Sequence, residues 1–437
     1  MSQKPAIRPR DRDTIIQALR AGVVPRLGLQ HIQVGRKREI EAIVRDVDRV
    51  ADGGAAARFI IGAYGSGKTF FLFLVRQVAL QRRLVVMQAD LGPDRRIHAT
   101  GGQARMLYSE LARSLATRTA PDGNALRSII ESFIVQTGEM LPGVPIGDAI
   151  STRLAPLREM VAGYDFATVV AAYARGYEES NEGLQDAALR WLRAEYTTKT
   201  EARADLGVRT IIDDQAFYDA LRLLAKFVRI AGHAGLLVCL DEMVNLYKLQ
   251  NAQARKQNYE QILRMLNDVL QGTTEGLCVL FGGTPDFLLD TRRGLYSYEA
   301  LQTRLAGNSF ASGDLIDMGG PVIRLQNLTI EELLHLLERL RDVFASGEPS
   351  NYLISDEGLH AFLEYCRSRI GEAYFQTPRN TVKAFVDLLS VLEQNPGSSW
   401  TERMGVLEIE TDHGAAADQA LLPDDPGADD DLATLRL

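Results

Sequence analysis

The sequence predicts an α/β fold with a three-layer core around a parallel sheet, a helical insertion in that core, and a C-terminal lid domain made only of helices. Residues 236–240 and 277–281 are apolar throughout, which is typical of strands buried on both faces of a parallel sheet. Further strands are expected at 58–61, 84–90 and 322–325, and amphipathic helical patterns lie between these runs. Alternation of this kind favours an α/β protein.

The same patterns divide the chain into segments. Residues 120–213 show helical patterns and Pro/Gly-rich joints but no strand pattern, which predicts a helical insertion. Thr329 and Glu332 have the spacing of a capping box at the start of a helix. We expect four segments: an N-terminal arm at 1–28, a core at 29–328, a lid at 329–397 and an acidic tail at 398–437. The insertion at about 120–213 belongs to the core. The lid should contain helices at 330–345, 356–369 and 378–393.

A glycine-rich segment, residues 62–69, carries the strongest chemical signal. It reads Gly-Ala-Tyr-Gly-Ser-Gly-Lys-Thr and lies between the strand expected at 58–61 and a helix expected at 70–81. Glycines let the backbone wrap around a polyphosphate, so that amide N–H groups and the helix N-terminus face the anion. Lys68 would reach the β- and γ-phosphates, and the Thr69 hydroxyl would bind Mg²⁺. A chance glycine-rich turn is the alternative, but all eight positions and both flanks match a phosphate-binding loop.

An acidic pair follows the apolar run 236–240. Asp241 and Glu242 would emerge at the carboxyl end of a buried strand, where ligands bind in open α/β sheets. Asp241 is placed to hold the Mg²⁺ shell, and Glu242 to activate the attacking water. Alone, the pair is equally consistent with a surface turn. Because it follows a complete phosphate loop, we interpret it as the partner acidic motif.

Further polar residues surround these motifs. Thr284 follows the strand at 277–281, where a polar side chain can sense the γ-phosphate. Arg379, just inside the last lid helix, could swing toward a nucleotide. Two arginine groups, Arg292 with Arg293 and then Arg304, follow Thr284.

Composition and charge limit the ligands and the cell compartment that we expect for this protein. Nine acidic residues and one base lie after position 406, which leaves 48 of each sign before it. The body is therefore neutral, and DNA contact would need local clusters such as Arg8, Arg10 and Arg12, or Arg82 and Arg83, which are more often plain surface. Three widely spaced cysteines argue for a reducing compartment. No apolar run is long enough for a membrane span, so we expect a cytoplasmic protein.

The acidic tail is rich in Asp, Ala, Gly and Pro. This composition favours disorder. A docking peptide at residues 432–437 is the alternative.

The order of these motifs resembles the AAA+ ATPases, in particular the clade of origin-recognition and initiator-loading ATPases. The resemblance covers roughly residues 29–395 and adds a Gly-Arg box at Gly35 and Arg36. More narrowly, segments 15–25, 62–69 and 240–247 are similar to the BrxD-like ATP-binding family of bacterial BREX phage-defence systems. About forty residues follow the lid, too few for the winged-helix domain that initiators append, which speaks against autonomous origin recognition.

The resemblance implies ATP and Mg²⁺ as ligands and gives roles to individual residues. Lys68 would bind the phosphates, and Thr69 and Asp241 would bind Mg²⁺. Glu242 would be the catalytic glutamate, Thr284 sensor 1 and Arg379 sensor 2. Arg304 would be the arginine finger, for which Arg292 or Arg293 could substitute. The loop and box residues that would line the nucleotide are Gly35, Arg36, Gly62, Tyr64, Gly65, Ser66 and Gly67.

Three functions remain open at this point. The first is an ATPase motor or switch in phage defence that assembles with itself or with a helicase partner, with double-stranded DNA as a further expected ligand. The second is an ATP-gated adaptor without motor activity, or a DNA-loading, initiator-like ATPase. The third, a signalling ATPase, would need sensor repeats or an effector domain, and neither is visible in the sequence.

Overall fold

The computed structural model describes residues 7–311, 317–370 and 378–404. Among these residues the chain forms two compact units. The sheet unit consists of Ile40–Ile60 and Val75–Ile323, and the helical unit consists of residues 7–39, 61–74 and 324–404. Most of the tail predicted at 398–437 lies outside the described residues.

A five-stranded parallel sheet forms the centre of the sheet unit and confirms the predicted α/β class. Its strands are β1 (Ala55–Ile61), β2 (Leu84–Asp90), β3 (Gly235–Asp241), β4 (Leu277–Gly283) and β5 (Val322–Arg324), in the order β2-β3-β4-β1-β5. The register of β2 on β3 runs from Leu84 opposite Gly235 to Asp90 opposite Asp241. β3 and β4 are buried at every position, as expected for central strands covered on both faces.

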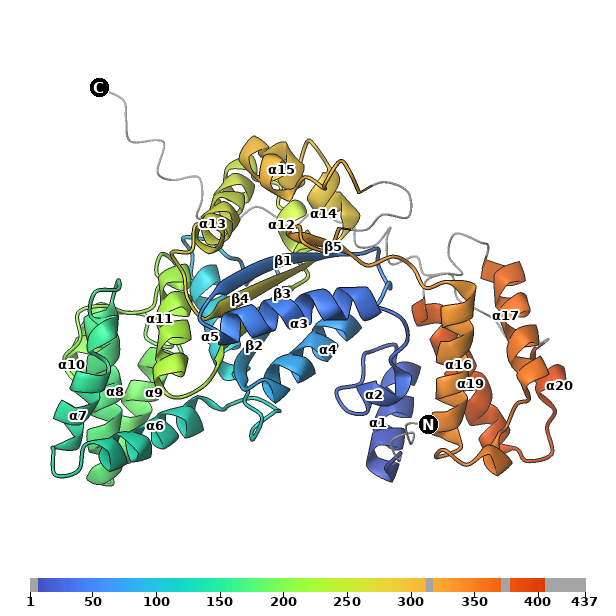
Figure 1. Cartoon of the computed structure of the whole chain (residues 1–437), viewed down its shortest axis with the longest axis horizontal. Coiled ribbons are helices and arrows are strands. Elements are labelled where there is room, and N and C mark those ends of the chain that lie inside the picture. The colour runs from blue at the N-terminus through green and yellow to red at the C-terminus, as the bar shows by residue number, and fades with distance from the viewer. Residues whose placement is uncertain (1–6, 312–316, 371–377, 405–437) are drawn as a thin grey trace. The chain divides into compact units, whose positions relative to one another are not determined.

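Helices surround these strands; α4 begins in the helical unit, which includes residues 61–74, and continues into the sheet unit. α11 packs against β3 and α5 against β2, while α3 runs in front of the strands in the view of Figure 1. The helices are α3 (Lys37–Ala51), α4 (Lys68–Gln81), α5 (Gln103–Arg113), α6 (Leu126–Met140), α7 (Ile146–Arg153), α8 (Gly163–Glu178), α9 (Glu182–Leu192), α10 (Lys199–Leu206), α11 (Phe217–Ile230), α12 (Val244–Tyr247), α13 (Ala252–Leu270), α14 (Pro285–Leu289) and α15 (Glu299–Leu305), with 3-10 turns η1 (Ala155–Leu157) and η2 (Leu295–Ser297).

Residues 120–213 contain the helices α6–α10 and no strand. An aromatic cluster joins them to α11: the ring of Phe227 lies 5.4 Å from that of Phe133 and 5.3 Å from that of Phe166. Phe166 also meets Trp191 edge-on at 6.3 Å. Offset and edge-on aromatic pairs of this kind add to the energy of burial, so the helical segment is anchored on a helix that itself packs on the sheet.

One helix start differs from prediction. Asp213 and Asp214 stand directly before the amphipathic segment 215–231, a position that predicts N-terminal caps for a helix there. Asp213 does accept the N–H groups of Gln215 and Ala216. Asp214 instead accepts the N–H groups of Gly102 and Arg105, at 2.6 and 2.8 Å, at the start of α5. The prediction was wrong for Asp214 because a carboxylate is as effective at the N-terminus of a distant helix as at its own.

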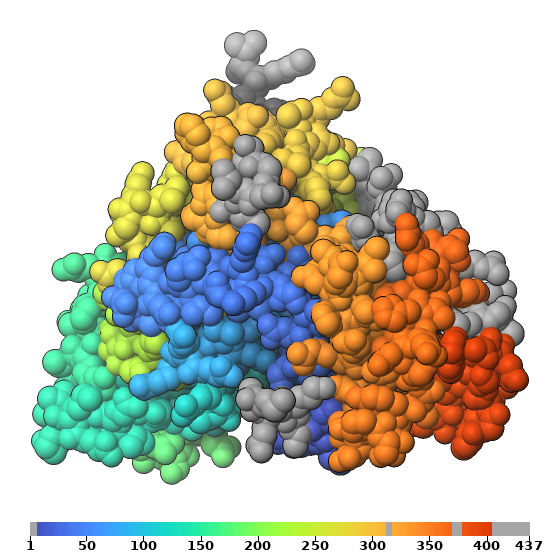
Figure 2. Space-filling model, turned by 45° about the vertical axis from the view of Figure 1, so that its right-hand side comes forward, coloured from blue at the N-terminus to red at the C-terminus, as the bar shows by residue number. Residues whose placement is uncertain are grey.

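The helical unit joins the two ends of the chain. It contains α1 (Pro9–Arg20), α2 (Leu29–Ile32), α16 (Ile330–Phe344), η3 (Pro349–Asn351), α17 (Asp356–Ile370), α19 (Pro378–Gln394) and α20 (Trp400–Met404). The three longest begin and end close to the predicted bounds, and Thr329 with Glu332 forms the predicted capping box. Figure 2 shows α16, α17, α19 and α20, coloured orange to red, as one continuous body.

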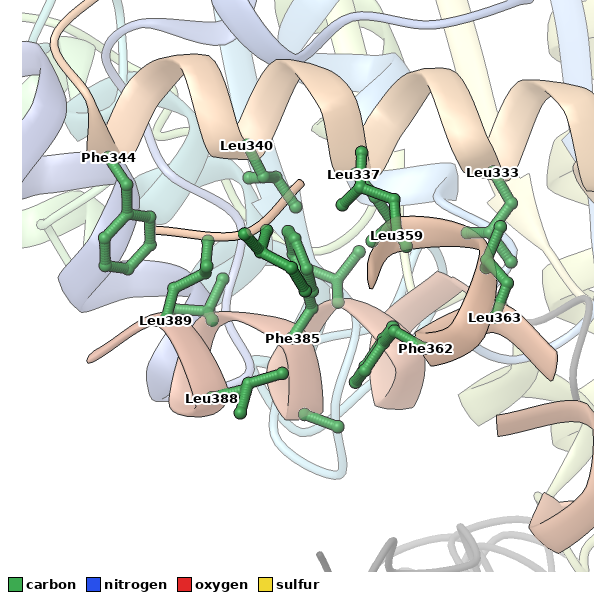
Figure 3. Close-up of a cluster of buried hydrophobic side chains, with 14 of the residues drawn as sticks. Leu333, Leu337, Leu340, Phe344, Leu359, Phe362, Leu363, Phe385, Leu388 and Leu389 are labelled. Atoms are coloured by element: carbon green, nitrogen blue, oxygen red, sulfur yellow. The ribbon is translucent and has the colours of Figure 1, made fainter. Parts of the chain in front are cut away.

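The core of the helical unit is a leucine- and phenylalanine-rich cluster, shown in Figure 3. Leu337 and Leu340 of α16 face Phe362 of α17 and Phe385 of α19, whose rings lie 5.1 Å apart. Ile15, from α1, is fully buried in the same cluster, and α1 packs on α16 and α19. The N-terminal arm is therefore part of this core.

Among the described residues, no helix has both the length and the apolar character needed to cross a membrane.

Candidate functional site

The glycine-rich loop occupies the turn that its sequence predicted. β1 ends at Ile61 and α4 begins at Lys68. Gly65 and Gly67 have φ angles of 72° and 89°, in the left-handed region that favours glycine. A Cβ added to Gly67 would meet no atom within 4 Å, whereas one added to Gly62 would lie 2.4 Å from Ser66 Oγ. A side chain at position 62 would therefore crowd Ser66, whereas the space around position 67 is open.

Donor groups gather at this loop. Lys68 Nζ donates to the carbonyl oxygens of Gly62 and Ala63, both at 3.0 Å, so the ammonium lies over the loop. Ser66 is buried, and its Oγ has no hydrogen-bond partner within the described part of the chain. No acidic residue lies in the first turn of α4, so the side chains of that turn do not offset the positive end of the helix dipole. A glycine cradle, an ammonium and a helix N-terminus together fit a polyphosphate.

Arg36 supports the loop from the Gly-Arg box. Its guanidinium donates to Ser66 O at 3.2 Å and lies 3.7 Å from Glu39. Burial lowers the pKa of Arg36, and the neighbouring Glu39 and Glu332 carboxylates oppose that shift. Gly35 has a φ of 65°, in the region that favours glycine, and a Cβ added there would lie 2.4 Å from Glu332 Oε1. The predicted box thus contacts both the loop and the capping residue of α16.

Arg379, predicted as sensor 2, contacts the loop from α19. Its Nη1 donates to the Tyr64 hydroxyl at 3.2 Å, and its Cζ lies 5.6 Å from the centre of the Tyr64 ring. A Cβ added to Gly22 would lie 3.6 Å from the Arg379 guanidinium. The helical unit therefore brings together the Gly-Arg box, the loop and Arg379. Gly22 lies in segment 15–25, which contributes to the family resemblance, but no sequence pattern predicts its place beside Arg379.

Asp241 and Glu242 lie where predicted, at the carboxyl end of β3. Asp241 is buried, and its Oδ1 accepts the N–H of Glu242 at 2.9 Å. Glu242 has a φ of 56°, an uncommon conformation for a residue with a side chain. Met243 N–H donates to Gly282 O of β4 at 3.0 Å and helps to hold this turn. Strained backbone of this type clusters at functional sites, and its cost here is consistent with a functional Glu242.

Thr284 follows β4 directly and caps α14. Its Oγ1 accepts the N–H of Phe287 at 3.3 Å. A hydroxyl that accepts one hydrogen bond can still donate its own proton, so capping leaves the sensor role chemically open.

The three arginines considered as fingers differ in their contacts. Arg304 donates to Asn267 Oδ1 at 2.7 Å and to Ala300 O at 2.8 Å. Arg293 donates to Leu249 O at 2.8 Å. Arg292 is exposed, and the hydrogen bond recorded for it among the described residues is made by its backbone N–H, to Asp290. The side chains of Arg304, the residue preferred from the sequence, and of Arg293 are thus held by hydrogen bonds within the chain, whereas that of Arg292 is exposed.

Comparison with known proteins gives the family. The family model described as "BREX system ATP-binding protein BrxC/D" matches residues 7–408. The chain belongs to this family. A search of curated proteins found no match. The predicted resemblance to BREX ATP-binding proteins is confirmed, and family membership carries an ATP-binding role in BREX phage defence.

Proposed function

We propose that this BREX ATP-binding protein is a cytoplasmic, Mg²⁺-dependent ATPase of the AAA+ type that acts as a motor or switch subunit in phage defence. The observation that carries the proposal is the loop at residues 62–69. It combines a glycine cradle, a buried Ser66 Oγ that has no hydrogen-bond partner among the described residues, and Lys68 at a helix N-terminus. Within one sheet, β3 lies two strands from β1. The acidic pair therefore belongs to the sheet whose β1 leads into the loop.

Each residue has a defined task in this proposal. The loop amides, Lys68 and Arg379 would hold and orient the phosphates, which is the main requirement of phosphoryl transfer. Thr69 and Asp241 would hold Mg²⁺, which on binding neutralises charge on the phosphate oxygens. Glu242 would orient and deprotonate the attacking water, and Thr284 would hold a γ-phosphate oxygen or that water.

The proposal is tested by ATP turnover and nucleotide binding in paired variants. Lys68→Ala should abolish both, whereas Glu242→Gln should abolish turnover and still bind ATP. Lys256→Ala and Glu260→Gln are matched controls, because these residues form a 3.8 Å ion pair with partly exposed side chains on α13, and both should keep full turnover. ATP turnover that persists in both Lys68→Ala and Glu242→Gln would contradict the proposal.

An ATP-gated adaptor is the second candidate, favoured by the contacts that tie the loop to helices. Arg379 of α19 holds Tyr64, and Arg36 holds Ser66 O, so a ligand that displaces these groups would bias the helices of the same unit. Negligible turnover combined with ATP-dependent partner binding would support this function. Partner binding that is indifferent to nucleotide would reject it.

For partners, we propose self-assembly or assembly with a helicase of the defence system. Residues 120–213 carry fourteen acidic and nine basic side chains, a charge that repels the phosphate backbone of DNA and suits a protein partner better. Light scattering with a nonhydrolysable ATP analogue, with and without double-stranded DNA, tests this. A strict monomer in every condition would exclude an arginine finger shared between copies.

A further inference from the structure

Arg96 is a buried cation in the loop between β2 and α5. The residue is only 7% exposed. Its Nε has no hydrogen-bond partner among the described residues, and Arg96 forms no ion pair with any of them. A guanidinium keeps its charge at every physiological pH, and burying a charge without a partner is costly. An anion from outside the chain would offset that cost.

The backbone on both sides of Arg96 is held in place. Gly92 and Arg95 exchange two backbone hydrogen bonds, at 3.1 and 3.2 Å, which close a tight turn directly before Arg96. Two residues after Arg96, the side chain of Asn258 in α13 accepts the N–H of His98 at 2.9 Å and donates to its carbonyl at 3.0 Å. Asn258 is itself fully buried. The loop is therefore pre-organised, which lowers the entropy cost of binding a ligand.

Further arginines lie at the base of this loop. Arg96 N–H donates to Gln103 O at 3.4 Å, at the start of α5. Two residues on, Arg105 Nη1 donates to Ala194 O at 3.0 Å. This contact brings the segment that follows α9, with Arg193, to the start of α5. Arg193 Nε, like that of Arg96, has no hydrogen-bond partner within the described part of the chain.

The carboxylates of this region are engaged elsewhere or exposed. Asp214 accepts two backbone N–H groups at the start of α5, at 2.6 and 2.8 Å. Glu195 accepts Arg113 Nη2 at 3.2 Å. Asp94 lies 3.7 Å from Arg95 Nε, but its side chain is 66% exposed, so water weakens that attraction. Positive charge therefore remains in excess around Arg96.

The loop starts at the carboxyl edge of the sheet. Leu91, the first residue after β2, donates its N–H to Asp241 O at 3.0 Å, and its carbonyl accepts Asn245 Nδ2 at 2.9 Å. Ligands of open α/β sheets bind at this edge. The loop that carries Arg96 is therefore on the ligand-binding side of the sheet.

We propose that Arg96 anchors a phosphate-binding site on the loop after β2, with Arg95 and Arg193 as flanking cations. The site is additional to the nucleotide loop at 62–69 and does not depend on the proposed ATPase activity. A guanidinium fits a phosphate because its parallel N–H groups can donate to two oxygens at once. The phosphate belongs either to a free ion or to a nucleic-acid strand, since both present the same oxygens.

The first test measures binding to the full chain carrying Lys68→Ala, which removes the phosphate lysine of loop 62–69. Inorganic phosphate and a short single-stranded oligonucleotide are the two probes. Adding Arg96→Met should weaken binding of the phosphate-bearing probe by about tenfold to hundredfold, the loss expected for a hydrogen bond between charged groups. Arg45→Met is the matched control, because it removes the same charge from an exposed position of α3, and it should leave binding unchanged.

The two probes distinguish the sources of the phosphate. Binding of inorganic phosphate alone would assign the site to a free ion. Binding of the oligonucleotide, with a slope of log Kd against log salt that falls by about 0.7 in Arg96→Met, would assign it to a nucleic-acid strand. If neither probe binds, or if Arg96→Met and Arg45→Met bind equally well, the proposal is wrong.

Thermal unfolding separates a ligand site from a purely structural role. Without ligand, Arg96→Met should unfold at the wild-type temperature or above it, because methionine keeps an apolar stem and removes the unpaired charge. The probe that binds should raise the unfolding temperature of Lys68→Ala more than that of Lys68→Ala with Arg96→Met. A lower unfolding temperature for ligand-free Arg96→Met would overturn the proposal.

ATP affinity shows whether the two sites are separate. In protein that keeps Lys68, Arg96→Met should bind ATP as tightly as the wild type. A loss of ATP affinity as large as that of Lys68→Ala would place Arg96 in the nucleotide site and overturn the inference of a second site. The proposed ATPase function would survive that result, since it is tested by Lys68→Ala and Glu242→Gln.

Discussion

The cores of the two units are assembled in different ways. In the sheet unit, β3 and β4 are continuous runs of sequence that are buried at every position. In the helical unit, the core combines Ile15 and Ile32 near the start of the chain with Leu333, Phe362 and Phe385 near its end. The first core can be identified from a short window of sequence, whereas the second exists only once the two ends of the chain meet.

Polar groups show a similar contrast. Arg58 of β1 and Asp46 of α3 form a buried bidentate ion pair in the sheet unit, at 2.6 and 3.0 Å. In the helical unit, the pair between Arg20 of α1 and Asp387 of α19 is about half exposed on both sides. We therefore expect the Arg58–Asp46 pair to contribute more to stability than the Arg20–Asp387 pair.

The largest expected effect comes from opening the helical core. Phe385→Ala should lower the free energy of unfolding by about 3–5 kcal/mol, since a buried ring is replaced by a cavity. Hydrogen exchange should show lost protection in α16, α17 and α19, and also in α1 at the other end of the chain. β3 and β4 should keep their protection, because the helices that pack on them belong to the sheet unit.

Phe310→Ala is the matched control for this change, since Phe310 is 86% exposed, and it should leave unfolding unchanged. If Phe385→Ala left α1 protected, the N-terminal arm would not depend on the helical core. If it exposed β3 and β4 equally, the two cores would unfold together and the comparison would fail.

Much of the sheet unit follows from the sequence for a local reason. Apolar runs predict β3 and β4, and the turns at Gly62 and Asp241 follow from the strand that precedes each. The contacts of Arg379 with Tyr64, and of Asp290 with Tyr247, could not be predicted in this way. They join residues far apart along the chain, and an exposed Tyr and an Asp in a loop have no periodic pattern that would reveal their partners.

An intermediate effect should come from the buried ion pair. Asp46→Asn should lower the free energy of unfolding by about 2–3 kcal/mol, because a hydrogen bond to a charged group is lost while Arg58 stays buried. Asp387→Asn, which weakens the exposed pair of the helical unit, should cost less than about 1 kcal/mol. Chemical denaturation of both variants measures the difference. Equal losses of unfolding free energy in the two variants would show that burial does not make the Arg58–Asp46 pair more important for stability than the Arg20–Asp387 pair.

The smallest expected effect is a pH dependence carried by one histidine in each unit. Burial is the main cause that lowers the pKa of both His31 and His233 below 6.5. Arg83 adds to the shift at His233, and at His31 Arg339 and Arg8 add to it while Asp11 opposes it. A base with a lowered pKa binds fewer protons in the folded protein than in the unfolded chain. Its contribution to stability is therefore complete above about pH 6.5 and falls as the pH drops.

Replacing either histidine should flatten this dependence. We expect the unfolding free energy of His31→Gln and of His233→Gln to fall less steeply between pH 7 and 5.5 than that of the wild type, as measured by denaturant titration at each pH. Asp11 opposes the lowering of the pKa at His31, whereas Arg83 adds to it at His233. The sheet unit should therefore show the larger change, and the reverse order would mean that Asp11 does not offset burial in the helical unit.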